Sequence, residues 1–139
     1  MRQAQTEIEI ETRGQGLVEF TSEAAGWVAG TGIQDGLLTL FCRHTSASLT
    51  IQENADPDVI ADLNDYFRKL VPEQSGSYRH AAEGPDDMPA HVRSALTDVS
   101  LSVPVAAGRL LLGTWQGLYL FEHRRRAHRR LLALHLLGE

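Results

Sequence analysis

Cysteine is almost absent from this chain of 139 residues, and so is any long apolar run. Cys42 is the only cysteine, which excludes an intramolecular disulfide framework and is typical of a reducing compartment. The first residues, MRQAQTEIEIE, contain no apolar h-region, and no stretch is long enough to span a membrane. We therefore expect a cytoplasmic protein with no membrane partner.

Positive charge is also scarce, because the formal net charge at pH 7 is −5. This balance argues against general nucleic-acid binding. The sign is unevenly spread: residues 1–100 hold 7 Lys/Arg against 16 Asp/Glu, whereas residues 101–139 hold 6 against 2. Most of the basic excess lies between Arg124 and Arg130, which leaves two alternatives open. The segment binds an anion through its guanidinium groups, or it is a solvated hairpin tip with nothing bound.

The length and composition fit one soluble globular domain, with 42% hydrophobic and 22% charged residues. Alternating or apolar segments predict strands at 5–12, 17–20, 37–42, 47–53, 99–105, 110–113, 115–121 and 131–137. Helices are expected at 57–71 and 89–96, with a short one starting at Ser22 as its N-cap. This order predicts an α+β domain spanning residues 1–139 with a mixed or antiparallel sheet.

Two of these elements carry further expectations. Asp56 is a good N-cap for the helix at 57–71, and Pro57 fits its first position. The strand at 131–137 is apolar on both faces, so it is either central in a sheet or covered by another subunit. If residues 43–46 form a turn, the strands at 37–42 and 47–53 pair with each other.

Polar side chains gather after the strand at 37–42, where the sequence reads HTSAS from His44 to Ser48. An imidazole and three hydroxyl groups at the end of a strand suit a chemical site, although hydroxyl groups also satisfy turns. Residues 73–90 have no periodicity, and a loop of that length is usually functional or disordered. His80 lies in this loop and His91 near the start of the following helix. No two histidines have the local spacing of a helical zinc motif, so unrelated surface histidines remain the alternative.

Two features of the last third also attract attention. Glu122 ends an otherwise apolar strand, where a carboxylate needs a cationic partner such as a metal, Arg109 or Arg124. The segment from Gly113 to Gly117, GTWQG, combines glycines with neutral hydrogen-bonding side chains, but it matches no phosphate-loop pattern.

Together, the segments HTSASLTIQENADPDV, YRHAAEGPDDMPAHVRSAL and GRLLLGTWQGLYLFEHR resemble the YjbQ family in order over nearly the whole chain. The resemblance implies a compact α+β protein that is usually a homotrimer. The apolar strand at 131–137 and Trp115 lead us to expect a homotrimer with its site at or near a subunit boundary. The resemblance also implies a weak secondary thiamine-phosphate synthase activity, which joins an aminopyrimidine pyrophosphate to a thiazole phosphate. A bound divalent metal is implied as well, zinc first, with magnesium as the alternative for activity.

The resemblance assigns roles to particular side chains. We infer that the metal ligands are His44, His80 and His91. The expected catalytic residues are Glu122, Glu83 and Asn54. The residues expected to bind substrate are Ser46, Ser48, Thr114, Gln116 and Arg124.

Three functions follow from these expectations. The first is an enzyme acting on small phosphorylated heterocycles, with thiamine-phosphate formation as a measurable activity. The second is a trimeric, metal-containing binding protein for a small phosphorylated metabolite, favoured by the absence of any Walker-type or nucleophile-elbow motif. The third is a metal-dependent hydrolase in which water is the nucleophile.

Overall fold

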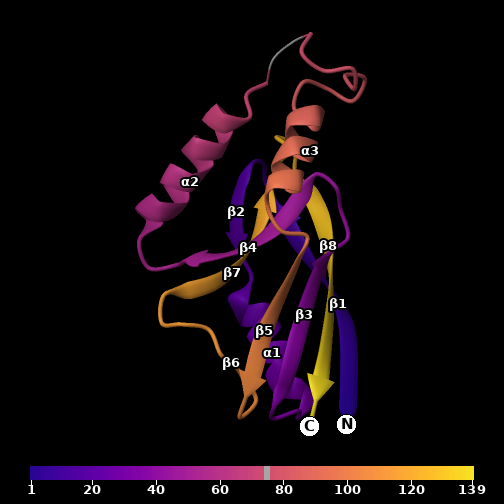
Figure 1. The fold of residues 1–139 in the computed structure, drawn as a ribbon, viewed down its shortest axis with the longest axis vertical. Coiled ribbons are helices and arrows are strands. Elements are labelled where there is room, and N and C mark those ends of the chain that lie inside the picture. Colours follow the sequence, from indigo (N-terminus) through magenta and orange to yellow (C-terminus); the bar gives the residue numbers. More distant parts are fainter. Residues whose placement is uncertain (74–75) are drawn as a thin grey trace.

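The computed structural model describes residues 1–73 and 76–139, which form two antiparallel sheets and three helices (Figure 1). The larger sheet has the order β1 (Arg2–Thr12), β8 (His128–Gly138), β3 (Gly36–Cys42), β5 (Ser100–Ala106) and β6 (Arg109–Leu110). The smaller sheet has the order β2 (Gly16–Glu19), β7 (Gln116–Glu122) and β4 (Ala47–Glu53). The helices are α1 (Thr21–Thr31), α2 (Pro57–Leu70) and α3 (Asp87–Leu96). The predicted α+β class is confirmed.

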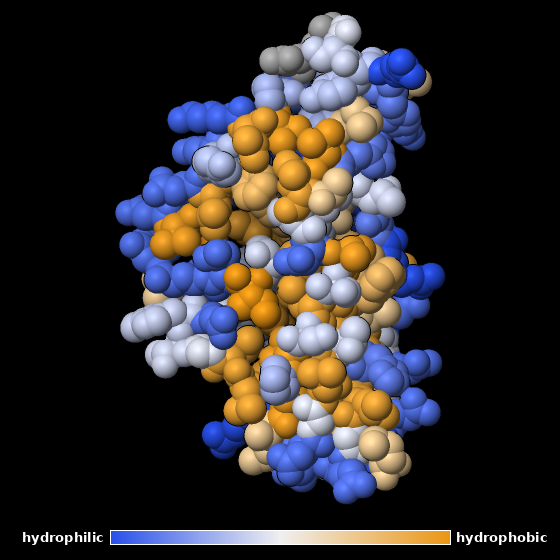
Figure 2. Space-filling view, viewed as in Figure 1, coloured by the Kyte–Doolittle hydropathy of each residue, from blue (hydrophilic) through white to orange (hydrophobic). Residues whose placement is uncertain are grey.

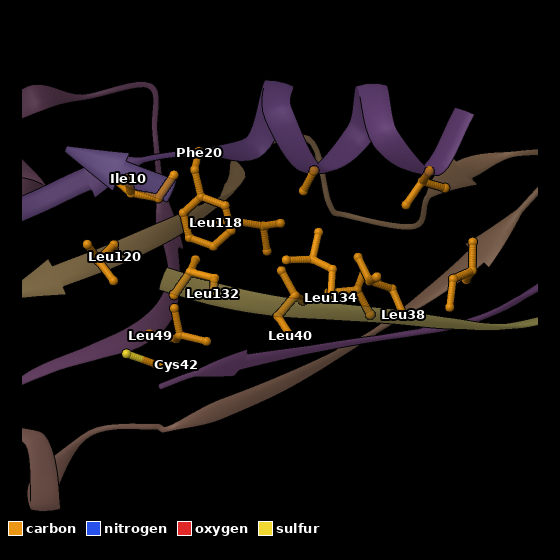
Figure 3. Packing of buried hydrophobic residues seen from close by; sticks show 14 of the residues in the cluster. Ile10, Phe20, Leu38, Leu40, Cys42, Leu49, Leu118, Leu120, Leu132 and Leu134 are labelled. Carbon is orange, nitrogen blue, oxygen red and sulfur yellow. The ribbon is translucent and has the colours of Figure 1, made fainter. Parts of the chain in front are cut away.

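Strand β8 lies between β1 and β3, so the prediction of a central position for the apolar segment 131–137 is confirmed. Alternate residues of β8 point into the core, where Leu132, Leu134 and Leu136 are each at most 1% exposed. Figure 3 shows Leu132 and Leu134 beside Leu38 and Leu40 of β3, beneath the helix α1. The core therefore lies between the larger sheet, α1 and the smaller sheet.

The chain changes sheets between β3 and β4. Strand β3 pairs with β5 and β8, and β4 pairs with β7, so the expected pairing of segments 37–42 and 47–53 is wrong. The reason is that both edges of β3 are already hydrogen-bonded to other strands, so β4 has to leave the sheet. Residues 43–46 make this crossing, and they belong to the polar HTSAS segment.

The first two helices depart from the sequence pattern in different ways. Helix α1 starts one residue before Ser22, with no side-chain cap, and continues to Gly32, where φ is 76°. Helix α2 is capped as predicted, since the side chain of Asp56 accepts a hydrogen bond of 2.9 Å from the N–H of Asp58. None of its residues is buried, however, and α2 lies to one side of the sheets (Figure 1).

Helix α3 starts at Asp87, two residues before the predicted start at Pro89, and this adds a carboxylate to its first turn. Of the predicted loop 73–90, Gln74 and Ser75 lie outside the described residues. The predicted strand 110–113 is shortened to the two residues of β6. Strands β7 and β8 lie in different sheets, so the arginines between them are not the tip of a hairpin. No described helix is long and apolar enough to cross a membrane.

The outer face of the larger sheet, opposite α1, carries exposed apolar side chains. Leu37 and Phe41 of β3 are 45% and 46% exposed, and Leu137 of β8 is 42% exposed. Val99, just before β5, is 48% exposed. In Figure 2 hydrophobic residues gather over the strands of this sheet and over α3. This face lacks the cover that α1 gives to the opposite face.

Candidate functional site

Two histidines and one aspartate meet at the start of α3. Asp87 and His91 are four residues apart on the helix and share one face, and His80 reaches them from the preceding loop. The Oδ2 atom of Asp87 lies 2.7 Å from Nε2 of His80 and 3.2 Å from Nε2 of His91. The ligand atoms lie within 4.8 Å of one another, and this is the one such group within residues 1–73 and 76–139. The exposed Glu83 carboxylate lies 2.9 Å from His80 Nε2.

The contacts of His91 determine which of its ring nitrogens carries hydrogen. Its Nδ1 atom lies 3.1 Å from the carbonyl oxygen of Thr45, which can only accept, so Nδ1 is the protonated nitrogen. In a neutral ring the lone pair of Nε2 then faces the carboxylate of Asp87, which is unfavourable. Either a second proton on the ring or a cation shared between Nε2 and Oδ2 removes this repulsion. The hydrogen bond to Asp87 raises the pKa of His80, the other ring at this carboxylate.

Arg124 holds the opposite oxygen of Asp87. Its Nη1 donates to Asp87 Oδ1 at 2.6 Å, its Nε donates to Asp86 Oδ2 at 3.1 Å, and its Nη2 donates to the carbonyl of Glu83 at 2.9 Å. Burial raises the pKa of Asp87, but the hydrogen bond to His80 and the charge of Arg124 outweigh it and keep the pKa below its usual value. The guanidinium group that was expected to bind substrate is therefore occupied by the protein, and it orients Asp87.

His44 does not join this cluster. Its Nε2 atom accepts a hydrogen bond of 2.7 Å from the N–H of Leu131 in β8, so the structure brings together His80 and His91 but not the third predicted ligand. Desolvation is the main cause that lowers the pKa of His44, and the charge of Arg130 lowers it as well, so the ring stays neutral. His44 instead lines an open cavity of about 590 Å³ together with Thr45 and Ser46. Because the carbonyl of Thr45 binds His91, this cavity adjoins the cluster.

Arg130, which lines that cavity, forms a buried ion pair with Glu122. Arg130 is 4% exposed and Glu122 is fully buried. The guanidinium group donates from Nε to Glu122 Oε1 at 2.8 Å and from Nη2 to Oε2, and Nη2 also donates to the Ser46 hydroxyl at 3.0 Å. Burial raises the pKa of Glu122, but the hydrogen bonds from Arg130 and Thr12 lower it by more than burial raises it. The pKa therefore lies below its usual value. This carboxylate is committed to Arg130 and is badly placed to act as a base.

Ser48 is also internal. It is 1% exposed, and its hydroxyl lies 2.8 Å from Nε2 of His123 and 2.6 Å from the hydroxyl of Thr97. Desolvation lowers the pKa of His123 to about 3, so its ring is neutral at every ordinary pH. The structure thus places Ser48 in a buried network behind the cavity, whereas Ser46 reaches the cavity itself.

The remaining predicted residues lie at the far end of the smaller sheet (Figure 1). Asn54 donates to the carboxylate of Glu19 at 3.0 Å, and Oε1 of Gln116 accepts from a backbone N–H three residues earlier at 2.7 Å. Thr114 is exposed in the same connection. Strand β4 separates these groups from His91 by about 20 Å, at roughly 3.3 Å per residue. Within one chain they do not belong to the cluster.

Sequence reasoning missed Asp87 and Arg130 as site residues. With the helix predicted to begin at Pro89, Asp87 falls in the preceding loop, whereas in the structure Asp87 and His91 have the i, i+4 spacing of ligands on one helix face. Arg130 continues the inward alternation of Leu132 and Leu134 by one step, which placed it in the core rather than in a solvated tip.

Comparison with known proteins gives a consistent result. The model of the family "UPF0047 protein YjbQ-like" matches residues 6–139. A UPF0047 protein of Synechocystis is 54% identical over 99% of this chain and 94% of its own length, and YjbQ of Escherichia coli O157:H7 is 40% identical over 97% and 98%. Crystal structures from Clostridium acetobutylicum and Thermus thermophilus have TM-scores of 0.87 and 0.85 at 33% and 36% identity. Each covers 95% of this chain and 99% of its own.

Proposed function

The chain belongs to the UPF0047 (YjbQ-like) family, and from this premise we propose that it is a divalent-cation-dependent enzyme acting on a small phosphorylated substrate. One observation carries the proposal. The Nδ1–H of His91 is committed to Thr45, so when this ring is neutral its Nε2 and Oδ2 of Asp87 face each other as two acceptors 3.2 Å apart. A cation held by His80, Asp87 and His91 turns this repulsion into coordination.

The residues fit zinc better than magnesium. Two imidazole nitrogens and one carboxylate oxygen are ligands that zinc accepts, and three protein ligands leave one position for water or substrate. Magnesium prefers oxygen ligands and keeps several waters. The outer contacts are also present, since Thr45 orients His91 and Arg124 orients Asp87. The proposed ligand set therefore replaces His44 with Asp87.

The adjoining cavity suits an anionic substrate. Arg43 and Arg130 line it and contribute positive charge, although they are also paired with Glu7 and Glu122. Neutral His44 protonated on Nδ1 adds an N–H donor, because its Nε2 accepts from a backbone N–H. Ser46 accepts from Arg130, so its own hydroxyl hydrogen is available to a phosphate oxygen. Phe41 supplies an apolar wall for a heterocyclic ring.

The specific reaction we propose is the joining of an aminopyrimidine pyrophosphate to a thiazole phosphate. A second cavity of about 230 Å³, lined by Tyr78, His80 and Met88, gives room for a second ring beside His80. The bound cation would supply charge stabilisation to the departing pyrophosphate. The chain itself would hold the phosphate through Ser46 and Arg130 and keep Asp87 oriented through Arg124.

The test combines metal content with product formation. The purified protein is stripped of metal, reloaded with Zn²⁺ or Mg²⁺, supplied with both substrates and assayed for thiamine phosphate. We expect Asp87→Asn and His91→Ala each to lose most of the bound metal and the activity. His44→Ala is the discriminating variant, because we expect it to keep the metal. Loss of metal from His44→Ala with retention in Asp87→Asn would overturn the ligand set. Absence of product with intact metal binding would overturn the synthase reaction alone.

Metal-dependent hydrolysis is the second candidate, and Glu83 favours it. This carboxylate is 64% exposed and lies 2.9 Å from His80, so it can accept a proton from a water molecule beside the cluster. Release of inorganic phosphate from a phosphate ester, abolished by Glu83→Gln with the metal retained, would select this reaction. A phosphorylated ligand that raises the melting temperature and is recovered unchanged would instead indicate a binding protein.

We also propose that the protein is a homotrimer. The outer face of the larger sheet exposes Leu37, Phe41 and Leu137. Trp115 is also exposed, directly before β7 in the smaller sheet. Light scattering over a dilution series should give three times the chain mass, and Phe41→Glu should lower it. A monomeric wild-type protein at micromolar concentration would contradict the assembly.

A further inference from the structure

A small cavity lies between α2, α3 and the end of β7, and none of the proposed metal ligands lines it. Among the described residues, three buried side-chain atoms have no hydrogen-bond partner: Asn64 Oδ1, Arg93 Nε and His123 Nδ1. All three residues line this one cavity. Unpaired buried polar atoms are rare in folded proteins, and three at a single cavity point to a common ligand.

The size of the cavity limits the ligand to one small molecule or ion. The space is about 10 Å³, which is close to the minimum for a single water molecule. It excludes a phosphate group or any metabolite. This cavity therefore differs from the two larger cavities at the metal cluster, which have room for a metabolite.

The charges and hydrogen-bonding roles of the lining atoms identify the ligand. Arg93 is 4% exposed and donates from Nη2 to the carbonyl of Val71 at 2.7 Å. Its charge excludes a cation. Its Nε–H needs an acceptor, whereas Oδ1 of Asn64 needs a donor. With the amide of Asn64 oriented so that Oδ1 is the unpaired atom, a monatomic anion can satisfy only the Nε–H of Arg93, but a water molecule satisfies both atoms.

His123 can use the same ligand in either of its neutral forms. Its Nε2 atom is paired with the hydroxyl of Ser48 at 2.8 Å, and a hydroxyl either donates or accepts. If Nε2 carries the hydrogen, Nδ1 needs a donor; if Nδ1 carries it, Nδ1 needs an acceptor. Water supplies either role, which no ion can do.

We infer that one structural water molecule is bound in this cavity, where it accepts from Arg93 and donates to Asn64 with His123 as its third partner. The water would join α2 through Asn64, α3 through Arg93 and the end of β7 through His123. Helix α2 has no buried residue of its own, so this bridge is a principal polar link between α2 and the body. The inference is independent of the proposed enzyme function.

A crystal structure of the full chain at about 1.5 Å resolution, with a parallel soak in bromide, decides the identity of the ligand. We expect one electron-density peak within about 3.2 Å of all three atoms and no anomalous bromide signal there. An anomalous peak at this position would overturn the assignment in favour of a halide site. Absence of any density would overturn the site itself.

Hydrogen exchange measures whether the water links the helices. In Asn64→Leu, which removes the acceptor, we expect no water density and about tenfold faster exchange of the α2 amides, since an unpaired buried group costs on the order of 1–3 kcal/mol. The matched control is Asp62→Leu on the exposed face of the same helix, which should leave both the exchange of the α2 amides and the density unchanged. Equal α2 exchange in Asn64→Leu and the wild type would refute the bridge.

Discussion

Replacing Glu122 with Gln tests how much the buried ion pair stabilises the fold. The substitution keeps the shape of the side chain but removes the charge opposite Arg130. The carboxylate accepts from Arg130, from the Thr12 hydroxyl at 2.6 Å, and from the N–H groups of His123 and Arg124 at 3.1 and 3.2 Å. A glutamine amide has one acceptor oxygen, and its NH₂ group would face donors.

The expected loss is large because Arg130 would keep its charge while only 4% exposed. Removing one partner of a buried pair costs about 3–5 kcal/mol, far more than the 0–1 kcal/mol of a surface pair. For a chain of this length we therefore expect the melting temperature to fall by about 10–20 °C.

Urea denaturation at pH 7 and fixed protein concentration provides the measurement. Glu9→Gln on β1 is the matched control, because Glu9 is exposed and should change the free energy of unfolding by less than about 0.5 kcal/mol. The double variant Glu122→Leu with Arg130→Met should recover much of the loss, since no buried charge is left unpaired. A loss below about 1 kcal/mol in Glu122→Gln would refute the argument that this pair is buried and committed.

Two further predictions concern acid stability and a close backbone contact. His123 has its ordinary pKa of about 6.5 in the unfolded chain, whereas in the folded protein its pKa is about 3. Below pH 6.5 the unfolded state therefore binds a proton that the folded state does not. The free energy of unfolding should fall by up to about 1.4 kcal/mol per pH unit. Denaturation between pH 7 and 5 should show a shallower fall in His123→Phe, and equal slopes would contradict the buried neutral ring. A Cβ on Gly36 would lie 2.3 Å from the carbonyl oxygen of Leu137, so Gly36→Ala should lose at least about 1–3 kcal/mol by thermal denaturation. Gly30→Ala, with nothing within 4 Å, should be neutral or stabilising, and similar effects of the two would be inconsistent with the contact.

The sequence predicted elements well where local periodicity decides them. Strand β4 matches its predicted range of 47–53, and Asp56 caps α2 as expected. Pairing could not be predicted in the same way, because it depends on which edges of β3 are free after the whole sheet has formed. Helix α2, none of whose residues is buried, illustrates a related limit: amphipathic periodicity shows that a face is apolar but not that the chain supplies a partner for it.

The candidate site was predictable in its residue types but not in its grouping. His80 and His91 do meet, whereas His44 is diverted by the N–H of Leu131, a contact between segments 87 residues apart. Family resemblance marks important positions without saying which of them share a site in one chain. Asn54 and Gln116 show this, because they lie at the opposite end of β4 from the cluster.

The crossing from β3 to β4 also has a thermodynamic consequence. Thr45 lies in this crossing and is bonded through its carbonyl to His91, so α3 is tied to the point where the two sheets are connected. A ligand that binds only the folded arrangement adds its binding free energy to the whole fold by mass action. Any cation held by His91 would therefore be a global stabiliser, and the two sheets, α3 and the loop of His80 would unfold at a temperature set by the concentration of free metal.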